Sequence, residues 1–210
     1  MVATQAKALV NSIKCGLGHP VAVTNQLIIL HSKQGNVLEA RKLFDEMPNR
    51  NVFSWNAMIS AYVKSCNLAQ ARALFDAAPV RDVVTYNTVL SGCADARGHE
   101  LDAVKMFGEM HAAGPVVGVD EITITTMLKL ATRMRWSGFG RQVHCYIAKM
   151  GSDIGDFTLC SLVDMYSKCG YYREACDVLK GCEFGRNSVL RNAMIAACCR
   201  GGEMAMAACI

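Results

Sequence analysis

Apolar residues recur along this chain at intervals of three and four, in paired stretches of ten or more residues. That period is typical of amphipathic α-helices, and the stretches are long for strands. One stretch of each pair opens with a polar residue, usually asparagine, followed by apolar ones. Aligned on that residue, the copies stand at Asn25, Asn56, Asn87, Thr125, Cys160 and Asn192. The spacings are 31, 31, 38, 35 and 32 residues, which predicts an array of structural repeats.

The second stretch of each pair repeats as well. Its fullest copy runs from Glu39 to Met47, and it returns at 70–76, 102–110 and 174–179. A glycine that can end a helix in the left-handed conformation separates the two stretches at Gly35, Gly98, Gly170 and Gly202. Each unit is therefore expected to be one helical hairpin. The predicted fold is an all-α, right-handed α-solenoid of stacked helix-turn-helix repeats.

The repeat boundaries follow from the alignment. We predict an incomplete repeat at 1–20, then repeats at 21–51, 52–82, 83–120, 121–155 (a long type), 156–187 and a truncated one at 188–210, all in one continuous array. Gln5 to Lys14 fits the second helix of the incomplete repeat better than an organellar presequence, although residues 1–38 lack Asp and Glu. The abrupt apolar end suggests a fragment of a longer array.

Composition narrows the class of protein. Hydrophobic residues make up 52% and charged residues 19% of the chain, which fits hairpins buried on both sides and argues against disorder. No apolar run is long enough to span a membrane. The eleven cysteines are odd in number and form no Cys-x-x-Cys pair, so they favour reduced, buried thiols in a reducing compartment over disulfides or zinc. The thiols expected to be buried are Cys66, Cys93, Cys169, Cys176 and Cys198.

The first helix of each unit has two chemically different faces. Counting from four residues before the aligned position, positions 7 and 8 are always apolar and predict the core. Positions 2, 5 and 13 fall on the opposite side, because successive residues turn by about 100°. Position 13 is usually basic, at Lys33, Lys64, Arg133, Lys168 and Arg200, with Asp95 the exception. These bases suggest a stripe that contacts phosphates, although they also complement the helix dipole.

Position 5 favours the first interpretation. Asparagine is a poor residue inside a helix, yet it recurs at Asn25, Asn56, Asn87 and Asn192. Its amide offers the donor and acceptor needed to meet the pairing edge of a base. Apolar neighbours at position 2, chiefly Phe53, Val84 and Ile122, would hold the base by its faces. The alternative is an asparagine ladder that fixes packing between repeats.

These residues resemble the plant pentatricopeptide repeat family, in the subclass that mixes long and short repeats. The match runs from about Gln5 to the end of the chain and is most specific at 40–48, 51–59, 83–90 and 163–170. Tetratricopeptide repeats share the architecture, but their Trp-x-x-Leu-Gly-x-x-Tyr signature is absent. The resemblance implies binding of single-stranded RNA in a mitochondrion or, alternatively, a chloroplast, one base per repeat. The implied processes are editing, splicing, processing or stabilisation of transcripts.

In that family, position 5 and the last residue of the unit read the base together. The resemblance implies that Asn25 with Asn51 favours C, and that Asn56 with Asp82 favours U. Asn87 with Asp120 would also favour U, which gives a run close to C-U-U. Thr125 with Gly155 and Cys160 with Asn187 depart from the family's pattern, and Asn192 lacks its partner.

We see no catalytic constellation in the sequence. The His-x-Glu and Pro-Cys-x-x-Cys motifs of a cytidine deaminase are absent, so no catalytic residue, metal or cofactor is expected. Chemistry would come from an editing or processing enzyme recruited in trans. The expected partner is single-stranded RNA, with neither DNA nor membrane. Two alternatives stay open, a helical scaffold that binds protein and a chain with too few matched repeats to bind well.

Overall fold

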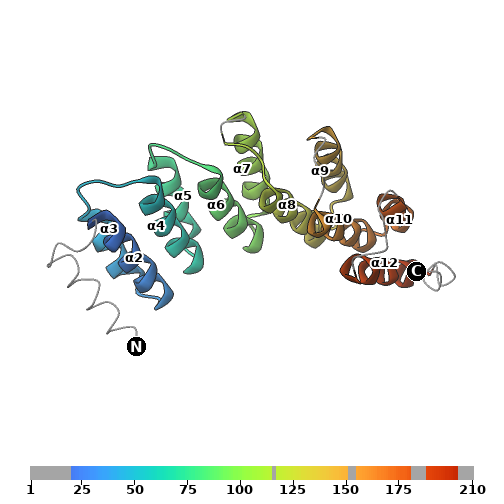
Figure 1. Ribbon diagram of the computed structural model, residues 1–210, viewed down its shortest axis with the longest axis horizontal. Coiled ribbons are helices and arrows are strands. Elements are labelled where there is room, and N and C mark those ends of the chain that lie inside the picture. The colour runs from blue at the N-terminus through green and yellow to red at the C-terminus, as the bar shows by residue number, and fades with distance from the viewer. Residues whose placement is uncertain (1–19, 115–116, 151–154, 181–187, 203–210) are drawn as a thin grey trace. The chain divides into compact units, whose positions relative to one another are not determined.

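A computed structural model describes residues 20–114, 117–150, 155–180 and 188–202. The described residues form eleven α-helices and no strand, which confirms the predicted all-α class (Figure 1). The helices are α2 (Pro20–Lys33), α3 (Val37–Asp45), α4 (Val52–Lys64), α5 (Leu68–Ala77), α6 (Val83–Asp95), α7 (Glu100–Ala112), α8 (Glu121–Met134), α9 (Ser137–Met150), α10 (Asp156–Lys168), α11 (Tyr172–Lys180) and α12 (Ser188–Gly201). No helix in these ranges has the length and apolar character needed to cross a bilayer.

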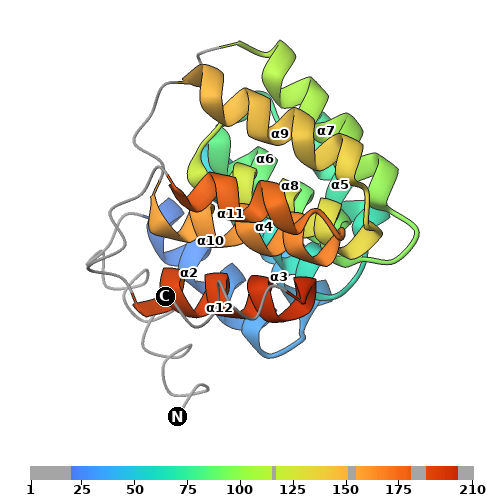
Figure 2. The ribbon, with the colours of Figure 1, turned by 90° about the vertical axis from the view of Figure 1, so that its right-hand side faces the viewer.

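The chain divides into two compact units, residues 1–118 and 119–210. In the first unit, the hairpins α2/α3, α4/α5 and α6/α7 stack so that α4 packs against both α2 and α6. In the second unit, α8 pairs with α9 and α10 with α11, while α10 also packs against α8 and α12. Figure 2 shows α10, α11 and α12 side by side. Each unit is thus a stack of helical hairpins.

The predicted core positions are buried. Residues 7 and 8 of the first helices are at most 4% exposed in five repeats, at Leu27, Ile28, Met58, Ile59, Val89, Leu90, Met127, Leu128, Leu162 and Val163. The second helices contribute alanines with no exposed surface, Ala40, Ala71, Ala103 and Ala175, whose small side chains let the helices approach closely. Each fully buried Leu or Ile contributes about 1.5–3 kcal/mol relative to an exposed one, so the stacking faces supply the main stabilisation.

Aromatic pairs join consecutive repeats in the same way. Phe44 meets Trp55 edge-to-face at 5.1 Å between ring centroids, and Phe75 meets Tyr86 at 4.9 Å. An arginine then closes the end of the second helix. Arg81, which follows α5, donates to the carbonyls of Phe75 and Asp76 in that helix, both at 2.7 Å. These contacts fix the direction in which the chain enters the next repeat.

The turn between paired helices uses the left-handed conformation in every described repeat. The glycines predicted there have φ between 75° and 87° at Gly35, Gly98, Gly170 and Gly202. The other two repeats place Cys66 (φ 59°) and Arg135 (φ 51°) at this point, where a side chain is strained. The expectation that Cys66 is an interior thiol was therefore wrong: it is exposed, because it occupies the turn.

The other four cysteines predicted to be buried differ in their exposure. Cys93, Cys176 and Cys198 are buried, and Cys169 is half-buried. No cysteine of the described residues forms a disulfide; the thiols of Cys176 and Cys198 lie 4.0 Å apart, within hydrogen-bond distance for sulfur. Burial raises the pKa of the Cys93 thiol above its usual value. These buried thiols pack as small apolar residues.

Candidate functional site

Each candidate site lies where the first helix of a repeat begins. The residue before α4 is Asn51, and its Oδ1 accepts from the Ser54 backbone N–H at 2.9 Å. Asp82 starts α6 in the same way, with Oδ1 accepting from the Thr85 N–H at 2.9 Å. In both cases the hydroxyl of the third helical residue accepts a hydrogen bond from the backbone N–H of the N-cap residue, which completes a capping box. Asp120 caps α8 through Thr123 at 2.8 Å.

This capping role was not predicted from the sequence. The last residue of a repeat, assigned only to base reading, is also the N-cap of the next helix. The signal was available, because Asn or Asp is followed three residues later by Ser or Thr at all three places.

The position-5 asparagines reach these caps. Asn56 Nδ2 donates to Asp82 Oδ1 at 3.1 Å, and the Thr85 hydroxyl lies 2.7 Å from Asn56 Oδ1. Asn25 Nδ2 lies 3.4 Å from Asn51 Oδ1. The two residues predicted to read one base are thus in contact in both repeats.

This contact changes the expected exposure of the amides. We expected them to line an open groove, but Asn25 is only 3% and Asn87 only 8% exposed. Asn56 is half-buried, and Asn192 on α12 is exposed. For Asn25, the contact with Asn51 of the neighbouring hairpin accounts for this burial, as the alternative of a ladder between repeats requires. The more accessible member of each pair is the cap, since Asn51 is exposed and Asp82 half-buried.

The two caps present different atoms beyond the bonds that they use. A backbone N–H can only donate, so the atom of Asn51 that caps Ser54 must be its oxygen. Its Nδ2 then carries the donors, while the equivalent atom of Asp82 is Oδ2, an acceptor. Neither atom has a hydrogen-bond partner within the described part of the chain. Asn51 therefore offers a donor where Asp82 offers an acceptor.

The Asp82 carboxylate is charged over a wide pH range. Burial by itself raises its pKa, but the hydrogen bonds from Thr85 and Asn56 outweigh that effect. The net result is a pKa below the ordinary value of 3.8. Asp82 thus acts only as an acceptor near neutral pH.

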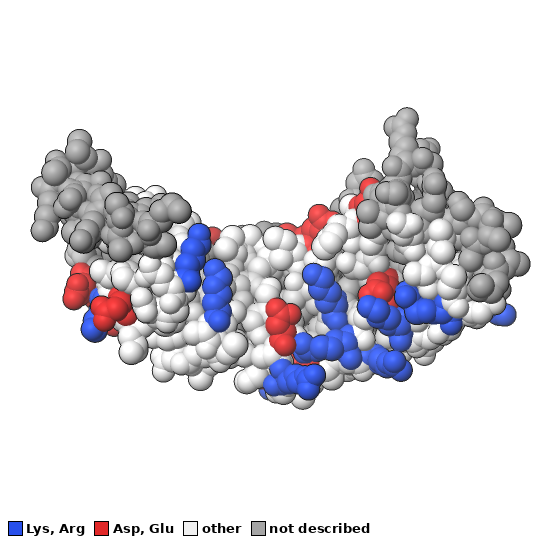
Figure 3. Space-filling view, turned by 90° about the horizontal axis from the view of Figure 1, so that it is seen from below, with Lys and Arg blue, Asp and Glu red and all other residues white. Residues whose placement is uncertain are grey.

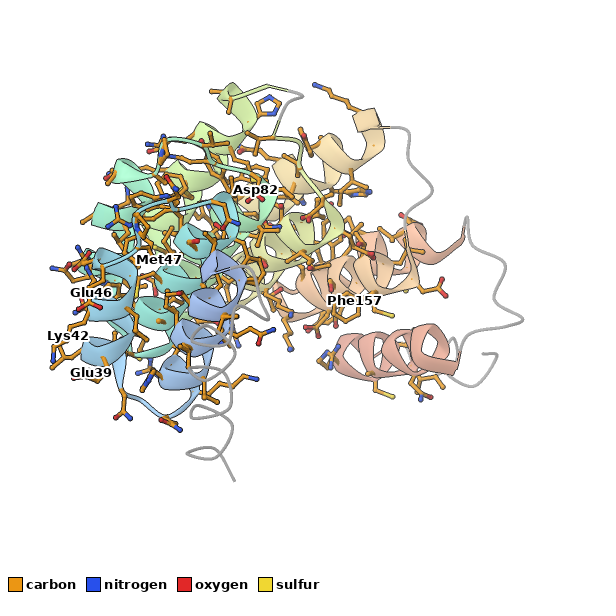
Figure 4. All side chains as sticks on the ribbon, turned by 60° about the vertical axis from the view of Figure 1, so that its left-hand side comes forward. Glu39, Lys42, Glu46, Met47, Asp82 and Phe157 are labelled. Atoms are coloured by element: carbon orange, nitrogen blue, oxygen red, sulfur yellow. The ribbon has the colours of Figure 1, made fainter. Side chains whose placement is uncertain are left out.

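Most of the residues predicted to contact RNA in the second repeat line one hollow. Its walls include Phe53, Asn56, Lys64, Asp82 and Val84, and its volume is about 570 Å³. Figure 4 labels Asp82 where α6 begins. A hollow of about 600 Å³ in the preceding repeat is lined by Asn25, Asn51 and Phe53, among others. The structure therefore brings the residues predicted to read a base together with apolar residues and, in the second repeat, with a lysine.

The apolar residues at position 2 are exposed despite their size. Phe53 is 56%, Val84 51% and Ile122 59% exposed, and Phe157 on α10 is also 59% exposed. Phe53 borders both hollows, one on each side of it. Large apolar side chains exposed at the same register position within each unit indicate contact surfaces.

The five basic residues at position 13 differ in their ion pairs more than the sequence predicted. All five residues are exposed, and Lys64 lines the second hollow. Lys168 Nζ, however, lies 2.8 Å from Asp164, and Arg200 lies 3.8 Å from the same carboxylate and donates to Ser167. Figure 3 shows acidic side chains among the basic ones on the face in view. The charges of Lys168 and Arg200 are therefore partly neutralised by Asp164, whereas Lys33 and Lys64 have no ion pair among the described residues.

The later repeats depart from this arrangement. Thr125 is 4% exposed, and its hydroxyl donates to the α8 carbonyls of Glu121 (2.9 Å) and Ile122 (3.1 Å). Gly155, the N-cap of α10, has no side chain to offer. Cys160 is half-buried, and Asn187 lies outside the described residues.

Titratable groups of the described residues form no metal-binding cluster. Burial lowers the pKa of His144, whose Nδ1 lies 2.9 Å from the Tyr166 hydroxyl. The exposed carboxylate of Glu39 pairs with Lys42 at 2.8 Å, and Figure 4 shows both on the outward side of α3. These groups have structural partners.

Comparisons with known proteins agree on one family. A sequence model described as "PPR repeat" matches residues 23–52, 53–81, 84–115, 157–182 and 189–209. The chain is 46% identical over 198 residues to a putative pentatricopeptide repeat-containing protein of Arabidopsis thaliana, At3g18840, covering 93% of this chain and 29% of that protein. It is 43% identical over 192 residues to the mitochondrial pentatricopeptide repeat-containing protein At2g22410 of the same plant, covering 91% and 28%. The chain thus spans less than a third of these relatives.

Solved structures share the fold. The crystal structure of the maize pentatricopeptide repeat protein PPR10 superposes with a TM-score of 0.64 at 23% identity, covering 97% of this chain and 30% of PPR10. PPR10 in complex with an 18-nt psaJ RNA element gives a TM-score of 0.62 at 22% identity, covering 97% and 34%.

Proposed function

Because the chain belongs to the pentatricopeptide repeat family, we propose that it binds single-stranded RNA selectively, one base per repeat. The observation that carries this proposal is the hollow lined by Phe53, Asn56, Lys64, Asp82 and Val84. It combines apolar surfaces for the faces of a base, polar groups for its edge and a cation for its phosphate. The related fold of PPR10 in complex with RNA supports the same function.

In this proposal the cap decides between pyrimidines. Uracil presents an N3–H donor on its pairing edge, which matches the Asp82 Oδ2 acceptor. Cytosine presents an N3 acceptor, which matches the Asn51 Nδ2 donors. The amides of Asn25 and Asn56, which contact these caps, hold them in place and complete the contact to the base. With Asn87 and Asp120 serving the third repeat, the preferred run is C-U-U.

The remaining residues have supporting roles in this proposal. Phe53, Val84 and Ile122 sandwich the bases, and Lys33, Lys64 and Arg133 neutralise phosphates. Lys168 and Arg200 contribute less because they share Asp164. Thr125 and Asn192 occupy the base-reading position of their repeats in this proposal.

At the level of biology, we propose that the chain is a specificity adaptor for C-to-U editing or other transcript processing, with the enzyme recruited in trans. Relatives named mitochondrial and chloroplastic support an organellar site of action, with the mitochondrion favoured by the more similar of the two.

Fluorescence anisotropy with the 210-residue chain tests the proposal. A labelled RNA containing C-U-U should bind more tightly than one with G-G-G there, and more tightly than duplex DNA. Single-strand affinity falls with a log–log salt slope of about −0.7 per phosphate contact, so three contacts give about −2. Equal affinity for all three ligands, or a flat salt dependence, would contradict RNA reading. If RNA affinity does not depend on salt and the chain binds a peptide instead, the alternative of a protein-binding scaffold is favoured.

A further inference from the structure

The start of α10 lacks the capping side chain found at earlier repeats. Its N-cap is Gly155, yet the hydroxyl of Thr158, the third helical residue, still donates to a carboxylate. The acceptor is Glu121 Oε1 at 3.0 Å, from the first residue of α8. The equivalent bond at α6 runs from the Thr85 hydroxyl to Asp82 Oδ1 at 2.8 Å. A carboxylate from α8, the first helix of the preceding repeat, thus accepts the bond that the cap accepts elsewhere.

The space beside Gly155 confirms this substitution. A Cβ built on Gly155 would lie 2.6 Å from Glu121 Oε1 and 3.3 Å from its Cδ. The Glu121 carboxylate therefore fills the volume that a side chain at 155 would need. The backbone does not require glycine, because φ is −57°. A side chain at residue 155 would therefore have to displace the Glu121 carboxylate.

Glu121 has the properties that Asp82 shows in its own repeat. It is exposed, and its second oxygen has no hydrogen-bond partner within the described ranges. Ile122 and Phe157, each 59% exposed, stand beside it on α8 and α10. Lys129 Nζ lies 5.6 Å from the centroid of the Phe157 ring. The hydroxyl of Thr125 is committed to its own helix, so it does not compete for the carboxylate.

We propose that Glu121 supplies the base-specifying carboxylate of the repeat 121–155, in place of the missing side chain at residue 155. This inference rests on the proposed RNA-binding function. The free oxygen is an acceptor, so this repeat favours a base whose pairing edge carries a ring N–H, which is guanine or uracil, over adenine or cytosine.

The test uses the 210-residue chain and four RNAs of the form C-U-U-N, with N facing the repeat 121–155. The wild-type chain should bind the G and U forms about 3- to 10-fold more tightly than the A and C forms, as one net hydrogen bond implies. Glu121→Ala should abolish that preference. The double variant Glu121→Ala/Gly155→Asp should restore it, because the aspartate enters the vacated space. Circular dichroism checks that each variant is folded.

An internal control separates the inference from the function on which it rests. The second nucleotide, read through Asp82, should keep its preference for U over C in all three proteins. If that preference persists while Glu121→Ala leaves the fourth position unchanged, or the folded double variant fails to restore it, the assignment of Glu121 is wrong. If the wild-type chain shows no preference at either position, the proposed function fails and the inference falls with it.

Discussion

Two substitutions of Asp82 separate the start of a helix from the reading of a base. Asp82→Asn keeps an oxygen for the Thr85 N–H, as Asn51 does for Ser54 one repeat earlier. Since Asn and Asp are equally good N-caps, the free energy of unfolding should change by less than about 0.5 kcal/mol. Asp82→Ala removes the cap, which costs about 1 kcal/mol, and leaves the Asn56 amide without its acceptor, which costs about 1 kcal/mol more.

Thermal unfolding followed by circular dichroism measures these differences. A chain of this size loses roughly 2–4 °C in Tm per kcal/mol, so Asp82→Ala should lower Tm by roughly 4–8 °C while Asp82→Asn leaves it nearly unchanged. The same two proteins should differ in RNA binding. Asp82→Asn should reverse the preference for U over C at the second nucleotide, by about 3- to 10-fold, because a donor replaces the free acceptor.

Two results would refute this reasoning. If Asp82→Asn destabilises the chain as much as Asp82→Ala, the Oδ1 bond to Thr85 does not start α6 in the way described. If Asp82→Asn is stable but its base preference equals that of the wild-type chain, the free atom of the cap does not read the base.

Three further predictions concern stability. Cys66→Gly should raise the free energy of unfolding by about 0.5–1 kcal/mol, because it relieves a left-handed residue (φ 59°) at a cost in unfolded-state entropy; an unchanged urea midpoint would contradict this. Gly92→Ala should lower the free energy of unfolding, because the new Cβ would lie 2.7 Å from the Val63 side chain. Gly108→Ala, its control, has open space around the new Cβ and should raise that free energy by about 0.5–1 kcal/mol. Equal urea midpoints for the two variants would argue against the close packing of α6 on α4. Burial lowers the pKa of His144 in the folded chain, so stability should fall as pH drops below 6.5, and His144→Gln should flatten that part of the pH profile of Tm.

Much of the fold could be predicted from the sequence, because each repeat buries apolar residues at the same positions of its first helix. The first helices α4, α6, α8, α10 and α12 begin at the first residue of each predicted repeat. The paired apolar residues at positions 7 and 8 are buried because the helical period places them on the stacking face. The register of positions 2, 5 and 13 also predicted that Phe53, Asn56 and Lys64 share one face, and these residues line a common hollow in the second repeat.

The errors arose where a residue's role depends on a neighbour distant in sequence. The burial of Asn25 follows from contact with Asn51, 26 residues later, and the substitution by Glu121 involves Thr158, 37 residues away. No periodic pattern within a single helix encodes such pairs. The pairing of Lys168 with Asp164 was different, because its four-residue spacing on one helix was visible in the sequence.

The capping geometry constrains how this protein's target can change. A residue that begins a helix must accept a hydrogen bond from the backbone, which favours Asn, Asp, Ser and Thr. Within that set, Asn and Asp exchange with little loss of stability while presenting opposite hydrogen-bonding character. Under the proposed function, a lineage of such arrays can acquire a new RNA target one nucleotide at a time without passing through a poorly folded ancestor.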